Sequence, residues 1–188
     1  KGNRAGNFAL QNADLVISIG CHLSVSLTGF EYKFFSRDAN LFVVDIDKKE
    51  HKKNTVKINH FIHSDVNQFF VKFKGKFTFI EWLRTCKKWK EKWPTCLPKY
   101  KNDKLINKYQ FIESMQKELK SNSVVVSDAG STFYVTSQAF QPIKNQRYIT
   151  SGAQADMGFT LPAAIGASFA QKDRMIVGIT GDGSFQMN

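Results

Sequence analysis

Long apolar runs and cysteine pairs are both missing from this sequence of 188 residues. No uninterrupted apolar stretch reaches the roughly 18 residues that a membrane span requires, and the first residues lack the apolar core of a signal peptide. The three cysteines are odd in number and include no Cys-x-x-Cys pair, so they predict neither a disulfide framework nor a zinc site. We therefore expect a globular protein without membrane contact, located in the reducing cytoplasm.

Glycines are also missing from the position where a nicotinamide-binding unit needs them. Gly20 ends an apolar run, but residues 21–24 after it contain no further glycine. A dinucleotide site has a Gly-x-Gly-x-x-Gly turn there, because glycine lets the backbone approach the pyrophosphate closely. The sequence therefore argues against a nicotinamide-dependent dehydrogenase.

Basic residues, in contrast, are plentiful but unevenly placed. The formal net charge is +11, and residues 72–120 carry 14 basic and 5 acidic side chains, against 13 and 11 in the rest of the chain. No RNA- or DNA-binding signature accompanies this excess, so the pattern is more typical of a solvated face than of a nucleic-acid surface. A non-catalytic module that binds an acidic partner through this stretch stays open as an alternative function.

Short apolar runs ending in glycine or aspartate predict the strands of an α/β fold. Residues 14–20 and 41–47 are two such runs. Between them we predict a loop over 21–29 and a helix over 30–37, which together make a βαβ unit. Asp65 is placed to cap a further helix.

A lysine- and tryptophan-rich connector follows this unit. Trp82, Cys86, Trp89 and Trp93 have the spacing i, i+4, i+7 and i+11, which predicts a helix packed on its neighbours and stopped by Pro94. A second α/β segment lies beyond the connector. It has predicted strands at 123–128, 147–149 and 175–180, and predicted helices at 109–119, 130–139 and 159–171.

The expected fold is therefore α/β, with two parallel-sheet, three-layer segments. We place the first segment at residues 1–78, the basic connector at 79–105 and the second segment at 106–188. Open parallel sheets bind ligands outside the carboxyl ends of their strands, so the residues that follow each strand are the candidates for a site.

The residues after the last predicted strand have the composition of a diphosphate and metal site. An apolar run leads into a Gly-Asp-Gly-Ser sequence at 181–184. The glycines let backbone N–H groups approach an anion, and the Asp182 carboxylate offers hard oxygen to magnesium. A lone Gly-Asp-Gly is most often only a tight turn, so its context decides the interpretation.

That context is a second motif, Met-Gly-Phe-x-Leu-Pro-Ala-Ala-Ile-Gly-Ala, at residues 157–167. Followed by Gly-Asp-Gly-Ser-Phe, it resembles the cofactor domain of acetolactate synthases and related thiamine diphosphate (ThDP) enzymes. Residues 4–20 and 44–47 are similar to the second half of the central domain of the same family. The resemblance thus covers most of the chain, and the connector contributes least to it.

The resemblance implies a site for ThDP and Mg²⁺. Asp182 would be a metal ligand, with backbone and hydroxyl donors of Gly183 and Ser184 holding the diphosphate. Met157 would lie beneath the cofactor and impose its bent shape, and the turn at 129–132 would place a helix start beside the diphosphate. The expected cofactor-binding residues are Gly130, Ser131, Thr132, Ala155, Met157, Gly181, Gly183 and Ser184.

The resemblance also implies an enzyme, a transferase or lyase that acts on a 2-oxo acid. Residues 24–29 depart from the Asp-Asp-Arg run that acetolactate synthases usually carry before Val-Thr-Gly, and serine is a poor match for an arginine fork. Ser131 and Thr132 stand where Gln-His is common, and Ala155 where glycine is common. These departures favour a related decarboxylase or carboligase. A strict acetolactate synthase that uses FAD stays as the alternative.

Finally, the resemblance predicts that this chain is an internal part of a longer protein. Family members place a pyrimidine-binding domain before it and complete the cofactor domain after it. The glutamate that ionises the cofactor and the second metal ligand belong to those parts. We therefore expect no catalytic residue in this chain, no turnover by the chain alone, and a parent protein that forms a homodimer or homotetramer.

Overall fold

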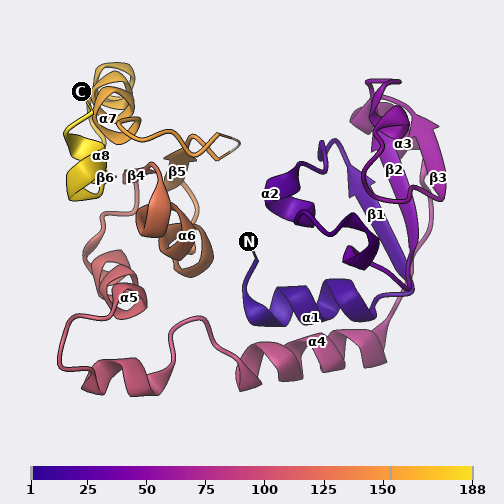
Figure 1. Cartoon of the computed structure of the whole chain (residues 1–188), viewed down its shortest axis with the longest axis horizontal. Coiled ribbons are helices and arrows are strands. Elements are labelled where there is room, and N and C mark those ends of the chain that lie inside the picture. Colours follow the sequence, from indigo (N-terminus) through magenta and orange to yellow (C-terminus); the bar gives the residue numbers. More distant parts are fainter. Residues whose placement is uncertain (1, 153, 188) are drawn as a thin grey trace. The chain divides into compact units, whose positions relative to one another are not determined.

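The computed structural model of the chain describes residues 2–152 and 154–187 (Figure 1). The chain forms two compact units that divide between Pro94 and Thr95, inside the predicted connector. Each unit contains one three-stranded parallel sheet with flanking helices, which confirms the α/β prediction. Among the described residues, no helix is long and apolar enough to cross a membrane.

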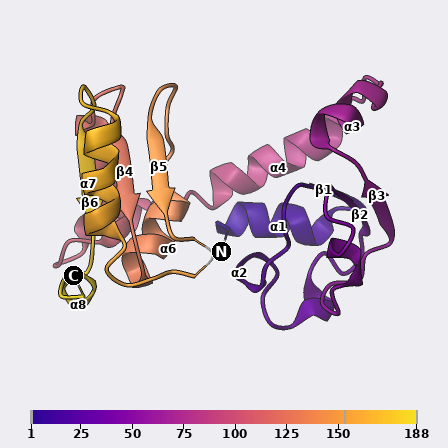
Figure 2. The same ribbon diagram turned by 90° about the horizontal axis from the view of Figure 1, so that it is seen from above.

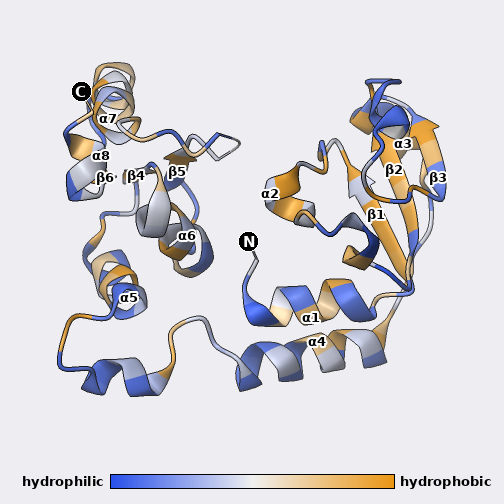
Figure 3. Cartoon of the chain, in the orientation of Figure 1, coloured by the Kyte–Doolittle hydropathy of each residue, from blue (hydrophilic) through white to orange (hydrophobic). Residues whose placement is uncertain are grey.

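The first unit is built on a sheet whose middle strand comes second in the sequence. Its elements are α1 (Arg4–Asn12), β1 (Leu15–Ile19), α2 (Val25–Thr28), the 3₁₀ turn η1 (Tyr32–Phe34), β2 (Asn40–Asp45), the 3₁₀ turn η2 (Glu50–Lys52), β3 (His60–His63), α3 (Val66–Lys72) and α4 (Ile80–Lys92). The strand order is β1-β2-β3, and Figure 3 shows these strands as strongly apolar stretches. Leu41 and Val43 of β2 are buried with Val56 and form the core on one face of the sheet.

The helix predicted over residues 30–37 is wrong. Only the single 3₁₀ turn η1 forms there, and the short helix α2 forms inside the stretch predicted as a loop. Ser36 adopts a left-handed backbone with φ of 49°, which a right-handed helix cannot contain. Tyr32 and Phe35 both pack against the β2 core, and this burial is gained without a regular helix.

Two other helix predictions in this unit are confirmed. The Asp65 carboxylate caps α3 by accepting hydrogen bonds from the backbone N–H groups of Asn67 (2.8 Å) and Gln68 (3.4 Å). Helix α4 packs on α1 through the ring of Phe8, whose centroid lies 4.4 Å from that of Trp93 and 5.8 Å from that of Trp89. The tryptophan spacing therefore reflects packing within the unit.

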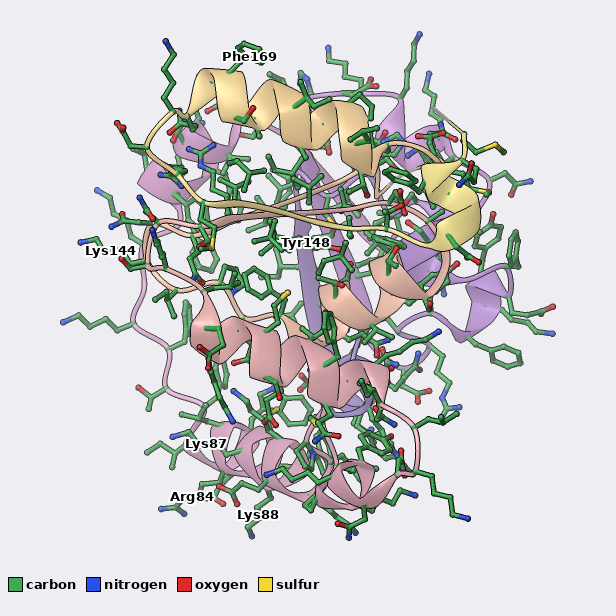
Figure 4. All side chains as sticks on the ribbon, turned by 90° about the vertical axis from the view of Figure 1, so that its left-hand side faces the viewer. Arg84, Lys87, Lys88, Lys144, Tyr148 and Phe169 are labelled. Atoms are coloured by element: carbon green, nitrogen blue, oxygen red, sulfur yellow. The ribbon has the colours of Figure 1, made fainter. Side chains whose placement is uncertain are left out.

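The opposite side of α4 carries basic side chains. Figure 4 shows Arg84, Lys87 and Lys88 pointing away from the helix. Arg84 forms an exposed ion pair with Glu81 one turn earlier (2.6 Å). This arrangement is that of a solvated helix face.

The second unit is a three-layer arrangement around a fully buried central strand. Its elements are the 3₁₀ helix η3 (Pro98–Asn102), α5 (Lys108–Glu118), β4 (Val124–Ser127), α6 (Gly130–Ala139), β5 (Arg147–Thr150), α7 (Thr160–Ala170), β6 (Ile176–Ile179) and α8 (Asp182–Phe185). The strand order is β5-β4-β6, all parallel. Helices α5 and α6 lie on one face of the sheet and α7 on the other (Figure 1). The predicted strands and helices of this unit are all confirmed.

Two contacts explain how the layers close. Ile112 of α5 and Val135 of α6 are buried against Val125 of β4, and Tyr148 of β5 packs against the same cluster. On the α7 face, a Cβ atom added at Gly178 would lie 3.0 Å from the Thr160 side chain, so glycine allows the helix to approach the sheet closely. The tight layers hold the strand ends, and therefore the loops that follow them, in fixed positions.

Candidate functional site

The loops after β4 and β6 meet at the carboxyl edge of the second sheet. These two strands are parallel neighbours, and their last residues, Ser127 and Ile179, are paired. The residues that follow therefore emerge side by side, and Figure 2 shows α8 and α6 at this end of the strands. This is the edge at which open parallel sheets bind ligands.

Asp128 is the centre of this edge. Its side chain is fully buried, and its Oδ2 accepts hydrogen bonds from the hydroxyls of Thr180 (2.9 Å) and Ser184 (2.5 Å). Its Oδ1 accepts from the backbone N–H of Ala129 (2.8 Å) and from the hydroxyl of Thr132 (3.2 Å). A buried carboxylate is stable only when it is fully hydrogen-bonded, so Asp128 ties the loop after β6 to the start of α6.

The same contacts set the charge of Asp128. Burial by itself raises the pKa of this carboxyl group, but hydrogen bonds from Ser184, Thr160, Thr180 and the Ala129 backbone outweigh it. The pKa of Asp128 therefore lies below its ordinary value, and the group is ionised at neutral pH. Its negative charge is used for holding the loops, because it has no exposed surface.

Ser184 extends this network to the loop before α7. Its buried hydroxyl donates to Asp128 and accepts a hydrogen bond from the backbone N–H of Gly158 (2.8 Å). The hydroxyl that the family resemblance assigned to the diphosphate is thus engaged inside the protein. The backbone N–H groups in the first turn of α8, including that of Ser184, have no partner within the helix and can donate to an anion.

A pocket of about 300 Å³ opens at this edge. Its wall brings together four of the predicted site residues, and it also contains Lys108 and Thr136, which the sequence analysis did not single out. The four predicted residues in the wall are Ser131, Thr132, Gly181 and Asp182.

The other predicted residues are not part of the wall of this pocket. Gly130 begins α6 with φ of 63°, and Ala155 has φ of 57°, a conformation that glycine adopts more easily. Met157 is 50% exposed, so it is not an ordinary core residue. A Cβ atom added at Gly183 would lie 3.9 Å from the Met157 Cε, which places this methionine against α8.

The site fits a diphosphate with a divalent cation. Magnesium uses few protein carboxylates and completes its shell with water and phosphate oxygens, so the exposed Asp182 is a suitable ligand. Open space surrounds Gly181 and Gly130, since an added Cβ atom at either would meet nothing within 4 Å. The described residues contain no cluster of three or more His, Cys, Asp or Glu that could enclose a metal ion without phosphate oxygens as further ligands.

Asp128 and Lys108 are among the residues of the candidate site that the sequence analysis did not single out. Asp128 appeared there only as the acidic end of a strand, although an acidic residue directly after a buried strand is a usable signal for this edge. Lys108 carries no signal, because it is one of many lysines in the connector region.

Comparison with known proteins finds two matching family models. The model of the central domain of thiamine pyrophosphate enzymes matches residues 1–73, and that of their C-terminal TPP-binding domain matches residues 128–188. Thiamine pyrophosphate is another name for ThDP. The second match begins at Asp128 and includes Asp182, so it covers both loops of the site.

Curated relatives match along the whole chain. The acetolactate synthase isozyme 1 large subunit of Escherichia coli K12 is 31% identical over 100% of the chain and 33% of its own length. The acetolactate synthase large subunit of Lactococcus lactis is 32% identical over 99% of the chain and 32% of its own length. The probable acetolactate synthase large subunit of Methanocaldococcus jannaschii is 29% identical over 100% of the chain and 33% of its own length. The chain thus spans about a third of these relatives' length. From these matches, the chain belongs to the thiamine pyrophosphate enzymes and resembles acetolactate synthase large subunits.

Proposed function

We propose that the protein carrying this chain is a ThDP- and Mg²⁺-dependent enzyme that decarboxylates a 2-oxo acid or joins it to a second carbonyl compound. The observation that carries the proposal is the pocket between α6 and the loop after β6, where Asp182 lies beside two helix starts. When bound, ThDP supplies the carbanion chemistry that cleaves or forms a carbon–carbon bond next to a carbonyl. The protein binds and orients it.

The metal and diphosphate contacts follow from the pocket wall. Asp182 would hold Mg²⁺, and the first-turn N–H groups of α6 and α8, including those of Thr132 and Gly183, would face phosphate oxygens. Asp128 is a positioning residue in this proposal. It holds both helix starts without touching the ligand, since it is fully buried.

The organic part of the cofactor would lie against Met157. A half-exposed apolar side chain beside α8 offers a surface on which a heterocyclic ring can rest. The backbone near Ala155 would hydrogen-bond the aminopyrimidine. The left-handed conformation of Ala155 turns the chain just before Met157 and sets the direction of these groups.

The substrate and the assembly are proposals for the whole protein, because the relatives are about three times as long as this chain. A 2-oxo acid is proposed as the substrate and a homodimer or homotetramer as the assembly. Acetolactate synthesis with FAD is the second candidate, favoured by the names of the similar proteins. In residues 24–29, however, the Ser24 and Ser26 hydroxyls hydrogen-bond each other (2.8 Å) and no cation is present to bind a carboxylate. Flavin absorbance of the purified protein separates the two candidates.

The test is ThDP binding by calorimetry with and without Mg²⁺, on the full-length protein. Asp182→Ala should weaken Mg²⁺-dependent binding by at least about tenfold, because the metal loses its protein carboxylate. Asp173→Ala is the matched control, an exposed aspartate in the loop before β6, at the opposite end of that strand from Asp182, and it should bind like the wild type. Equal affinity of Asp182→Ala and the wild type, or no binding by either, would contradict the proposal.

A further inference from the structure

The segment that leads from α3 into α4 combines exposed apolar side chains with lysines. Every residue from 71 to 84 is exposed, and residues 70–80 contain three lysines and no acidic residue. The large apolar side chains of this stretch have exposed fractions between 46% and 70%, and they are Phe70, Val71, Phe73, Phe77, Phe79 and Ile80. A protein surface in water usually carries such side chains singly, so a group of them marks an interaction surface.

Four phenylalanine rings of this segment contact one another in a row. The ring centroids of Phe69 and Phe73 lie 5.3 Å apart, those of Phe73 and Phe77 5.9 Å, and those of Phe77 and Phe79 6.3 Å. The row is therefore one continuous apolar strip, which we call the phenylalanine strip. Rings that pack on one another leave few faces for the bases of a single-stranded nucleic acid, which binds by stacking on such faces.

The phenylalanine strip borders a hollow on the first sheet. The hollow has a volume of about 360 Å³, and its wall is wholly apolar. The four rings of the strip line it together with Leu15, Ile17, Phe42 and Ile62. A hollow of this kind offers no hydrogen bond to a sugar, a base or a peptide group, so a hydrocarbon chain fits it best.

The lysines beside the strip differ from the basic residues on the outer face of α4. On that helix, Arg84 forms an ion pair with Glu81, and Glu91 stands among the lysines. Lys72, Lys74 and Lys76, in contrast, alternate with phenylalanine and glycine. Positive charge and exposed apolar surface thus occur together at residues 69–80. This is the combination with which peripheral proteins bind membranes that contain anionic lipids.

We propose that residues 69–80 form a contact surface for a membrane that contains anionic lipids. The three lysines would meet the lipid headgroups, and the phenylalanine strip with its hollow would accept acyl chains. The expectation of no membrane contact rested on the missing membrane-spanning run, and peripheral binding needs no such run. The inference is independent of the proposed cofactor, because all of these residues belong to the first unit.

The test measures how tightly the full-length protein binds vesicles, by co-sedimentation. Vesicles of phosphatidylcholine with phosphatidylglycerol should bind the wild type at least about tenfold more tightly than vesicles of phosphatidylcholine alone, and added salt should weaken this binding. Changing the three lysines together to glutamine should lower the affinity for anionic vesicles at least about tenfold. The charge-matched control changes three exposed lysines of the second unit to glutamine and should bind like the wild type, with the substitutions at Lys117, Lys120 and Lys144.

The apolar half of the surface is tested by Phe77→Ser. The ring is 63% exposed, and its loss should lower the affinity for anionic vesicles about tenfold, because less apolar surface enters the membrane. Phe169→Ser is the control. Phe169 is 76% exposed on the outer side of α7 (Figure 4), and its replacement should leave vesicle binding unchanged. All variants should melt like the wild type without vesicles, since the replaced side chains are exposed.

Three outcomes would overturn the inference. The first is that the wild type does not bind anionic vesicles, or that the lysine variant binds them equally well. The second is binding of single-stranded RNA without vesicle binding, lost in the lysine variant but kept in Phe77→Ser, which would indicate a nucleic-acid surface. The third is a clearly lower melting temperature of Phe77→Ser without vesicle binding, which would show that another part of the protein covers the phenylalanine strip.

Discussion

The two units of this chain share one architecture and differ in what happens at the ends of their strands. In the first unit, Asp45 ends β2 and its Oδ1 accepts from the backbone N–H of Asp47, two residues later (2.9 Å). In the second unit, Asp128 follows β4 and joins groups that lie up to 56 residues apart. The same residue type at the same kind of position thus stabilises a local turn in one unit and joins distant loops at the carboxyl edge of the sheet in the other.

The sheets also differ in burial. All four residues of the central strand β4 are buried, whereas in the first sheet Phe42 of the central strand β2 is half-buried and the edge strand β1 leaves Leu15 47% and Ile17 39% exposed. Ile17 contributes to a wholly apolar hollow of about 360 Å³, which Phe69 and Phe73 line from the side of α3. The central strand of the second sheet is therefore covered on both faces, whereas one face of the first sheet is open at this hollow.

The largest expected difference between the units is in their cores. Ile112→Ala should lower the free energy of unfolding by about 2–5 kcal/mol, because Ile112 is buried between α5, α6 and β4. Ile17→Ala, the matched change on the exposed sheet face, should cost about 1 kcal/mol or less, since much of its surface is already in water. Urea denaturation followed by circular dichroism measures both. Equal losses of unfolding free energy in the two variants would show that the Ile17 face of the first sheet is covered in solution.

A smaller difference is expected for the two aspartates. Asp128→Asn should cost about 1–3 kcal/mol, because an amide cannot accept all four hydrogen bonds and leaves a buried donor without a partner. Asp45→Asn keeps an oxygen for the Asp47 N–H and should change stability by less than about 0.5 kcal/mol. Hydrogen exchange of the amides in α6 and α8 should rise only in Asp128→Asn. A uniform rise in both variants would contradict a local role for Asp128.

The smallest effect is a dependence on pH. The pKa of Asp128 is lower in the folded protein than in the unfolded chain, so the folded state binds a proton less readily. Its contribution to stability is complete above the ordinary carboxyl pKa of about 3.9 and is lost as the pH falls through the lowered folded value. Urea midpoints from pH 7 down to pH 3 should fall less in Asp128→Asn than in the wild type. Parallel curves would show that other carboxyl groups dominate the acid sensitivity.

Sequence reasoning was most successful where the signal is local. The tryptophan spacing predicted α4, and the Gly-Asp-Gly-Ser run marked the loop that lines the pocket. It failed at residues 30–37, where burial of Tyr32 and Phe35 together with the left-handed Ser36 replaces the expected helix with one 3₁₀ turn. Local propensity is weak, and tertiary packing overrides it in a short segment of this kind.

The sequence by itself determined the α/β alternation, the family and the composition of the candidate site, because strand runs, helix spacing and glycine turns are properties of neighbouring residues. Only the tertiary structure decided the central place of Asp128, the engagement of the Ser184 hydroxyl and the bridge from Lys108 to Ser131. The contacts of Lys108 with Ser131 and of Ser184 with Asp128 join residues 23 and 56 positions apart. They exist because the parallel pairing of β4 with β6 and the packing of α5 on α6 bring distant loops to one edge of the sheet.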